Sequence, residues 1–312
     1  MNQPIVKVQN LSHRYAIQWA IRDINFEINR KGVYGLLGSN GSGKSTIMNI
    51  MCGILKQTQG NVYIHGIDIS KNPVEAKKHI GFLPQLAPLH TELTVEEYLT
   101  HAANMRLMPV KSIPEAVKKA MEKCALLHFR KRLIHNLSGG YKQRVGIAQA
   151  IVHNPDFIIL DEPTNGLDPN QILEVRHLIR EIAEEHTVLL STHILQEVQA
   201  VCDHIWMINE GSQVFSGTVH EFDSYIMPNS LVVTLMSPPS ESELSQLSGI
   251  EDVEDIGNKS FKIRFNDSNE AIEEIVKKSV EKQWLLREIR IEKTSMDSVF
   301  AELSKNGKNK KK

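Results

Sequence analysis

The sequence lacks several features that would assign a chain to a class at once. It has three cysteines among 312 residues, scattered and odd in number, so neither a disulfide framework nor a cysteine metal site is expected. No apolar run approaches the length of a membrane-spanning helix, and no signal-peptide pattern opens the chain. The formal net charge of −1 provides no global argument for nucleic-acid binding. We therefore expect a globular protein of a reducing compartment.

The strongest positive signal is the stretch Gly38–Ser45. It fits the phosphate-loop pattern G-x-x-x-x-G-K-[ST]. Glycines in such a loop let the backbone turn tightly and direct its N–H groups at phosphate oxygens. Lys44 adds a positive charge near the terminal phosphates, and the Ser45 hydroxyl is a suitable Mg²⁺ ligand. The residues expected to contact a nucleotide here are Gly38, Ser39, Asn40, Gly41, Ser42, Gly43, Lys44, Ser45 and Thr46.

The segments on either side of this loop fit the same interpretation. Residues 33–37 form a short apolar run, as a buried strand would. After the loop, Ile47, Ile50, Met51 and Ile54 recur at helical spacing. A helix that begins there directs its partially positive N-terminus at bound phosphates. An accidental match in a Gly/Ser loop is the alternative, and a strand before and a helix after argue against it.

Two acidic residues follow a second apolar run. Residues 157–160 read Phe-Ile-Ile-Leu, a fully buried strand, and Asp161 and Glu162 come directly after it. Carboxylates at such a place are costly unless they meet a cation or a reacting water. Asp161 fits a Mg²⁺ partner, and Glu162 fits a general base for water. The alternative is an ordinary exposed acidic turn, which the phosphate loop earlier in the chain disfavours.

Three further residues are weaker candidates. Tyr15 lies shortly before the phosphate loop and either stacks on a nucleotide base or covers core. Gln85 and His193 each follow a predicted strand, where ligands of open α/β sheets bind. Taken singly, Gln85 fits an ordinary loop residue at least as well as a ligand contact. His193, taken singly, fits a surface or capping residue at least as well.

The segment Leu137–Arg144 contains a second possible anion site. Ser138 is placed to cap the helix that follows, and Gly139 and Gly140 allow close backbone approach. Free N–H groups at a helix start bind anions. A plain helix-start loop is the alternative. Asp168 is similarly placed to cap the next helix, which Pro169 opens.

The length favours one large and one small domain. Helical sequence interrupts the strand–helix alternation over residues 92–133, where Thr94 and Glu97 form a capping box and Pro114 starts a second helix. From residue 228 the predicted order is strand 231–236, helix 239–247, strands 251–256 and 259–265, helix 269–281, strand 284–292 and helix 296–304. This order suggests a small ferredoxin-like domain, in which we find no constellation suited to chemistry.

Taken together, these motifs resemble those of the ATP-binding subunits of ABC transporters. Gly38–Ser45 matches the Walker A loop, residues 157–161 the Walker B strand, and residues 137–140 the family signature. Tyr15, Gln85, Asp168 and His193 fall where the family has its A-loop aromatic, Q-loop, D-loop and switch histidine. Details such as Ser-Gly-Gly-Tyr-Lys-Gln-Arg and Gly-Leu-Asp-Pro-Asn-Gln are similar to subunits that serve ABC-2 type permeases, closest to the drug-export and gliding-motility-associated ones.

The resemblance implies an α/β fold. A P-loop NTPase (ABC ATPase) domain over residues 1–227, with a helical subdomain at about 92–152, would precede a C-terminal α+β ferredoxin-like domain over 228–304. The last residues, 305–312, would be a basic disordered tail, either a solvated end or a contact for anionic lipid.

The resemblance also implies roles for single residues. Tyr15 would stack on adenine, and Lys44 with the loop amides would hold the phosphates of ATP. Ser45, Gln85 and Asp161 would arrange Mg²⁺. Glu162 would polarise the attacking water, His193 would hold the γ-phosphate, and Gln85 would take part in catalysis. Ser138, Gly139, Gly140 and Asp168 would complete the ATP site of a second subunit.

The resulting hypothesis is an ATPase that dimerises around two ATP molecules. It would pair with itself or a homologous subunit and drive a separate ABC-2 type permease, usually for export, from the cytoplasmic face of the cell membrane. No nucleic-acid partner is expected. The alternatives are a soluble ABC-type ATPase acting on ribosomes or DNA, and a nucleotide-sensing regulator. The single ATPase domain, the lack of a long coiled coil and the intact Glu162 and His193 argue against them.

Overall fold

The computed structural model describes residues 3–226 and 230–292 and divides into two compact units. The first extends to Glu221 and the second begins at Phe222. The predicted boundary at 228, the helix at 296–304 and the tail at 305–312 lie outside the described residues. Each unit is therefore described by itself.

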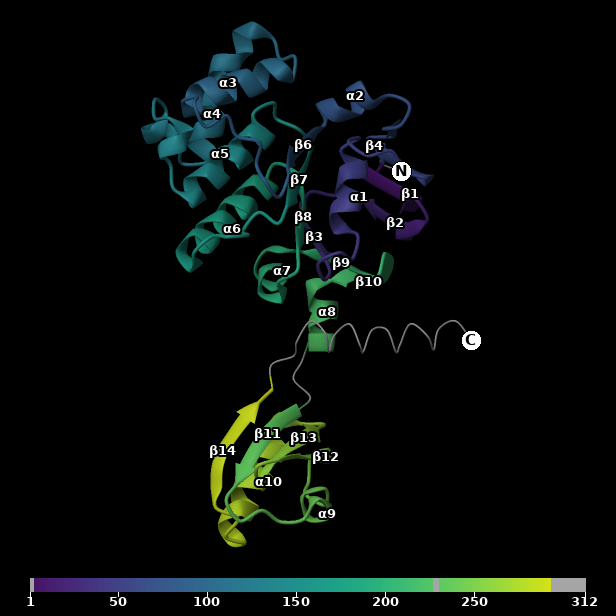
Figure 1. Ribbon diagram of the computed structural model, residues 1–312, viewed down its shortest axis with the longest axis vertical. Helices are drawn as coiled ribbons and strands as arrows, with labels where there is room; N and C mark the ends of the chain where they lie inside the picture. The colour runs from purple at the N-terminus through teal and green to yellow at the C-terminus, as the bar shows by residue number, and fades with distance from the viewer. Residues whose placement is uncertain (1–2, 227–229, 293–312) are drawn as a thin grey trace. The chain divides into compact units, whose positions relative to one another are not determined.

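A six-stranded sheet forms the centre of the first unit (Figure 1). Its order is β10-β9-β3-β8-β7-β6, with all neighbours parallel except β10 and β9. The strands are β3 (Gly32–Leu37), β6 (Ile80–Leu83), β7 (Phe157–Asp161), β8 (Thr187–Thr192), β9 (His204–Asn209) and β10 (Ser212–Thr218). Every residue of β7 and β8 is buried, which confirms the fully buried strand predicted from the apolar run at 157–160.

A second, antiparallel sheet has the order β2-β1-β4-β5. Its strands are β1 (Val6–Tyr15), β2 (Gln18–Ile28), β4 (Gln59–Ile64) and β5 (Ile67–Asp68). β1 and β2 are the long strands of this sheet, with ten and eleven residues. Their buried side chains join those of the helix after the phosphate loop in one apolar cluster, so this sheet packs beside the loop.

The helix that follows the phosphate loop is α1 (Lys44–Met51), with Ile47, Ile50 and Met51 buried as predicted. Ile54 does not extend this face, because it lies beyond the helix and is 63% exposed. Gly53 has a φ of 61° and ends the helix in a left-handed conformation that glycine adopts without strain. The other helices of this unit outside the helical subdomain are α2 (Pro73–Lys78), α6 (Pro169–Ala183) and α7 (Leu195–Val201). The next helix, α8 (Val219–Ile226), contains the division between the two units.

The helical subdomain consists of α3 (Val95–Met105), α4 (Ile113–Lys123) and α5 (Gly139–Ile151), which contact one another (Figure 1). Three 3₁₀ turns connect them, at Val110–Ser112, Leu127–Phe129 and Ile134–Asn136. The predicted capping box is present: the Thr94 hydroxyl accepts from the Glu97 N–H, and the Glu97 carboxylate accepts from the Thr94 N–H. Local sequence therefore sets the start of this subdomain.

The second unit follows the predicted element order. It contains β11 (Ser230–Leu235), α9 (Glu241–Leu244), β12 (Ile250–Gly257), β13 (Ser260–Phe265), α10 (Ser268–Glu281) and β14 (Leu286–Ile291). The antiparallel sheet has the order β12-β13-β11-β14. The helix expected over 239–247 is only four residues long, because Ser240 at its N-cap position has extended backbone and the helix ends at Leu244.

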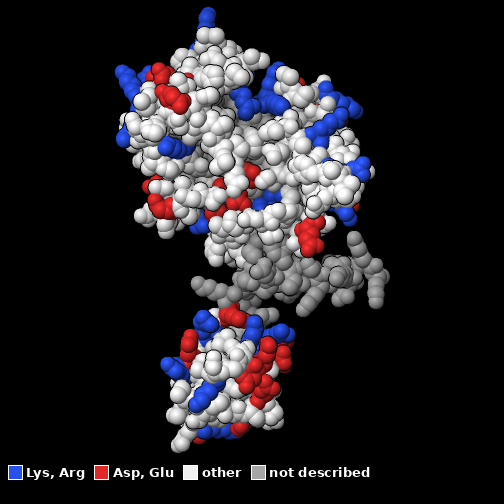
Figure 2. Space-filling model, viewed as in Figure 1, with Lys and Arg blue, Asp and Glu red and all other residues white. Residues whose placement is uncertain are grey.

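The surface of each unit carries charged side chains of both signs, as the face in Figure 2 shows. This agrees with the near-zero net charge of the chain. Among the described helices, none is both long and apolar enough to cross a bilayer.

Candidate functional site

A hollow in the first unit lies over the phosphate loop. Its volume is about 810 Å³. Nine of the residues predicted to contact nucleotide, metal or water line it: Tyr15, Asn40, Gly41, Gly43, Lys44, Ser45, Thr46, Gln85 and Glu162. The tertiary structure thus gathers residues from β1, the loop, the end of β6 and the end of β7 around one space.

The phosphate loop depends on glycine at Gly43. This residue has a φ of 111°, and a Cβ built on it would lie 2.5 Å from Ile21 Cγ2 and 2.9 Å from the Ala20 carbonyl oxygen. A side chain here would therefore collide with β2 as well as strain the backbone. Close packing against β2 holds the loop in a shape that leads into α1.

Lys44 is buried within the loop that it serves. Its Nζ donates to the carbonyl oxygens of Gly38, at 2.8 Å, and Ser39, at 3.1 Å, and lies 3.8 Å from Glu162 Oε1. Burial lowers the pKa of Lys44, and the nearby carboxylates of Glu162 and Asp161 partly oppose that shift. The neighbouring Ser42 is also buried, and its hydroxyl has no hydrogen-bond partner in the part of the chain that the structure describes.

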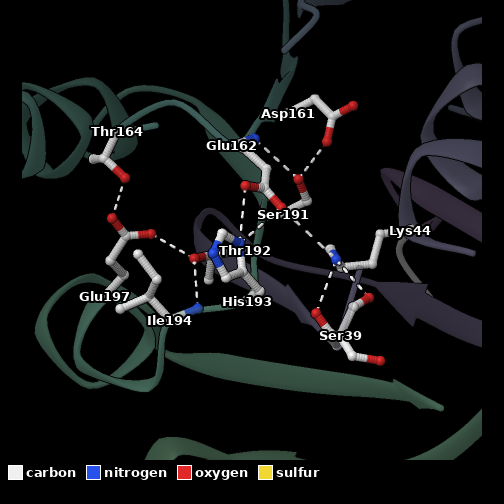
Figure 3. A network of polar contacts seen from close by, with 11 residues as sticks. Ser39, Lys44, Asp161, Glu162, Thr164, Ser191, Thr192, His193, Ile194 and Glu197 are labelled. Atoms are coloured by element: carbon white, nitrogen blue, oxygen red, sulfur yellow. Dashed lines mark hydrogen bonds and ion pairs between the residues drawn. The ribbon is translucent and has the colours of Figure 1, made fainter. Parts of the chain in front are cut away.

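Asp161 and Glu162 are 6% and 9% exposed, so an exposed acidic turn is ruled out. Ser191, opposite them on β8, donates from its Oγ to Asp161 Oδ1 and accepts from the Glu162 N–H at 3.0 Å (Figure 3). Glu162 has a φ of 49°, an uncommon conformation for a residue other than glycine. Such backbone strain is typical of functional sites.

His193 lies next to Glu162 at the end of the neighbouring strand. Its Nδ1 is 2.9 Å from Glu162 Oε2 and 3.1 Å from Oε1. Figure 3 shows the Glu162 carboxylate between His193 on one side and Lys44 on the other. His193, a weaker candidate from the sequence, and Glu162, a stronger one, therefore belong to one polar cluster.

The sequence did not single out Glu197, which is 3% exposed. This residue of α7 accepts hydrogen bonds from the hydroxyls of Thr164, after β7, and Thr192, beside His193 (Figure 3). The Thr192 hydroxyl also accepts from the Ile194 N–H at 3.0 Å. The only signal in the sequence was that Glu197 stands among apolar residues of a helical segment. That signal does not distinguish a buried glutamate side chain from an exposed one.

Tyr15 does not cover core, because its side chain is 53% exposed at the rim of the hollow. Its ring meets that of His13 edge-on at 4.7 Å between centroids. Trp19, which the sequence did not single out, lines the same hollow. The rim therefore offers two aromatic surfaces to a base.

Ser138 lies in a second, smaller hollow of about 240 Å³, lined by Ser138, Gly140, Tyr141, Arg144, Asp168, Asn170, Gln171 and Glu174. No residue is shared with the lining of the first hollow. Ser138 occupies the N-cap position of α5, yet its hydroxyl makes no capping bond, contrary to the expected cap. The Asp168 carboxylate does cap α6, accepting from the N–H groups of Asn170 and Gln171.

The comparison with known proteins decides the family. A family model described as ABC transporter matches residues 21–165. The bacitracin transport ATP-binding protein BcrA of Bacillus licheniformis is 37% identical over 209 residues, 66% of this chain and 67% of that one. The chain belongs to the ABC transporter family. As an ATP-binding subunit of this family it is an ATPase with the P-loop NTPase fold, and its nucleotide is ATP.

Other ABC proteins extend the likeness. The linearmycin resistance ATP-binding protein LnrL of Bacillus subtilis is 28% identical over 273 residues, 87% of this chain and 88% of that one. The solved structure of cbiO1 from Clostridium perfringens, part of an ABC transporter complex, matches with a TM-score of 0.66 at 31% identity. That match covers 71% of this ABC ATPase and 91% of the other chain. The names of the first two relatives describe ATP-binding proteins, and the third is described as part of an ABC transporter complex.

Proposed function

We propose that two copies of this chain, or one copy and a homologue, pair head to tail around two ATP molecules. The observation that carries this proposal is the separation of the two hollows. Lys44 and Glu162 line one hollow and Ser138 lines the other, with no residue in common. A second chain that places its Ser138 hollow over the first hollow completes each ATP site.

The free N–H groups at the start of α5 support this arrangement. Since no Ser138 side chain caps them, they remain available to an anion. A Cβ at Gly139 would meet nothing within 4 Å, so the backbone is open to close approach. The second hollow is thus suited to the γ-phosphate of an ATP that another chain binds.

Within each site the residues divide the work of phosphoryl transfer, which needs positioning and charge neutralisation above all. The loop amides and Lys44 hold the phosphates, and Tyr15 stacks on the base. Glu162 accepts a proton from the attacking water, while His193, hydrogen-bonded to Glu162, faces the γ-phosphate.

The donor set at the end of β7 fits Mg²⁺. The Asp161 carboxylate is buried, Ser191 is its one hydrogen-bond partner among the described contacts, and the Ser45 hydroxyl and Gln85 amide line the adjoining hollow. These are hard oxygen ligands of the kind that Mg²⁺ prefers. Bound Mg²⁺ neutralises charge that develops on the β- and γ-phosphates.

We further propose that the dimer drives a separate ABC-2 type permease in export, from the cytoplasmic face of the membrane. The relatives named for bacitracin transport and linearmycin resistance support a drug-like cargo. Leu86, next to Gln85 and 87% exposed, offers an apolar contact between the ATP site and such a permease. The segment around Gln85 and the helical subdomain would carry the coupling.

A mixing experiment tests the shared sites. Lys44→Ala removes one half-site and Ser138→Arg the other, so neither variant alone forms an intact ATP site. A dimer of one copy of each contains one intact site. ATP-dependent association, followed by size-exclusion chromatography, and ATP hydrolysis should both reappear on mixing. A mixture no better than the separate variants would contradict the head-to-tail arrangement, and circular dichroism checks that both variants fold.

A further inference from the structure

The amino-terminal edge of the central sheet carries a group of side chains that the ATPase does not use. His65 lies between β4 and β5, His79 ends α2 just before β6, and Asp156 comes just before β7. One atom of each, an imidazole nitrogen or a carboxylate oxygen, lies within 4.8 Å of the others. Within residues 3–226 and 230–292, no other His, Cys, Asp or Glu side chains form such a group.

The contacts within the group converge on one carboxylate oxygen. His79 Nδ1 lies 2.7 Å from Asp156 Oδ2, and His65 Nε2 lies 3.4 Å from the same oxygen. The two imidazole rings are 5.1 Å apart between centroids and tilted by 58°. Ligand atoms of a tetrahedral zinc site, with bonds of about 2.0–2.1 Å, lie roughly 3.3 Å apart, so small side-chain shifts give this spacing.

Backbone hydrogen bonds hold all three residues in place. The His65 N–H donates to the Ile5 carbonyl oxygen at 2.9 Å, and the His79 carbonyl accepts from the Phe157 N–H at 3.0 Å. The Asp156 carbonyl accepts from the Thr187 N–H at 3.0 Å. The three side chains thus project from strand ends and a short turn whose backbones are tied to neighbouring strands.

His65 shows two features that its surroundings do not explain. Its Nε2 is buried and has no hydrogen-bond partner among the described residues, which for a polar atom is costly. Its φ is 48° and that of Gly66 is 73°, the backbone of a two-residue hairpin turn in which asparagine is the usual first residue. A histidine whose ring nitrogen faces a carboxylate without bonding to it is placed as a metal ligand would be.

We propose that His65, His79 and Asp156 bind a divalent transition metal, with Zn²⁺ the best fit. Two imidazoles and one carboxylate suit zinc, with water in the fourth position, whereas Mg²⁺ prefers oxygen ligands alone. Side chains that are 33%, 33% and 55% exposed leave the site open to a metal from solvent.

This site is separate from the ATP site. Asp156 precedes β7 and Asp161 ends it, so the rise of an extended chain places their α-carbons about 16 Å apart. His65 lies in the turn between two strands of the antiparallel sheet, and Asp156 comes just before a strand of the central sheet. A bound metal would therefore join the two sheets and stabilise the first unit.

Metal binding to the full chain, freed of metal by chelation and without nucleotide, tests the proposal. Equilibrium dialysis should find one tightly bound Zn²⁺ per chain, and bound Co²⁺ should give visible absorption bands of low-coordinate cobalt. His65→Asn suits the turn and removes the ligand, so it should weaken binding at least about 100-fold while the fold is kept. His79→Gln should act in the same way. Zinc should raise the melting temperature of the wild type but not of either variant.

His177→Gln is the matched control. His177 is 77% exposed and lies 3.4 Å from Glu181, so it is a histidine–carboxylate pair without a third ligand. Its loss should leave the tight site intact. Zinc binding that is weak in the wild type, or that survives His65→Asn undiminished, would overturn the proposal. Circular dichroism and retained ATP binding separate either result from misfolding.

Discussion

The imidazole of His193 and the carboxylate of Glu162 meet at 2.9 Å between Nδ1 and Oε2. The pair bridges the carboxyl ends of β8 and β7, two parallel neighbours in the central sheet. On the other side of the same carboxylate lies Lys44 Nζ, 3.8 Å from Oε1. Glu162 is thus held between two groups that the proposed mechanism assigns to the γ-phosphate, which makes its own substitution the most direct test.

Replacement of Glu162 by glutamine should abolish most hydrolysis and spare ATP binding. The amide keeps the shape of the side chain but accepts no proton from water, and loss of a general base costs about 10²- to 10⁴-fold in rate. Phosphate release measures the rate, and size-exclusion chromatography with ATP should show a stable dimer. Turnover close to that of the wild type would refute the assigned role.

Replacement of Glu197 by glutamine should lower kcat by about tenfold or more while ATP affinity changes little. Glu197 does not line the hollow over the phosphate loop, but it accepts from the hydroxyls of Thr164 and Thr192, which lie close in the chain to Glu162 and His193. It is therefore a positioning residue for His193. Separate measurement of kcat and ATP affinity tests this role, since a purely structural defect would lower both.

A surface glutamate provides the control for Glu197. Glu185 is 68% exposed and pairs with Lys123, so Glu185→Gln should leave kcat unchanged. If Glu197→Gln behaves as this control does, the buried hydroxyl–carboxylate network has no part in catalysis.

Removal of the Tyr15 ring by substitution with alanine should weaken ATP binding between about fivefold and about 150-fold, which corresponds to roughly 1–3 kcal/mol for aromatic–base stacking. Tyr15→Phe should bind as the wild type does, because the ring remains. Fluorescent nucleotide titration measures both. Trp19 lines the same hollow, so a loss confined to Trp19→Ala would assign the stacking to that ring instead.

The stability of the first unit should fall in mild acid because of His153. Burial, with a smaller contribution from Arg106, lowers the pKa of His153 from 6.5 to about 4, while its Nε2–H donates to the Ile80 carbonyl oxygen at 3.0 Å. Since the folded pKa is the lower one, protonation favours the unfolded chain. Stability is therefore complete above pH 6.5 and declines as the pH falls towards 4.

Between pH 7 and pH 5 this single histidine should lower the free energy of unfolding by about 2 kcal/mol. Urea unfolding at the two pH values measures the loss. His153→Gln retains a hydrogen-bond donor but has no titrating ring, so it should reduce the pH dependence of the free energy of unfolding by that amount. His177→Gln, at an exposed position, should leave this pH dependence unchanged. Equal pH dependence in all three proteins would show that His153 is not buried in its neutral form.

Much of the site was predictable because its signals are local. The phosphate loop, the carboxylates after an apolar strand and the capping box at Thr94 each depend on residues only a few positions apart. Where local signals compete, prediction was less successful. Ile54 continued a helical spacing that Gly53 ends, and Ser138 occupied a cap position without a capping bond.

The sequence by itself determined the chemistry that we propose for the ATP site, since the order and spacing of Gly38–Ser45 and of Asp161 and Glu162 predict phosphate and water chemistry wherever the strands lie. Only the tertiary structure decided which residues meet. It separated Ser138 from Lys44, joined Glu197 to Thr164 and Thr192, and brought His65, His79 and Asp156 together. Such encounters depend on strand order and register, which unite residues far apart in the chain and leave no periodic trace in the sequence.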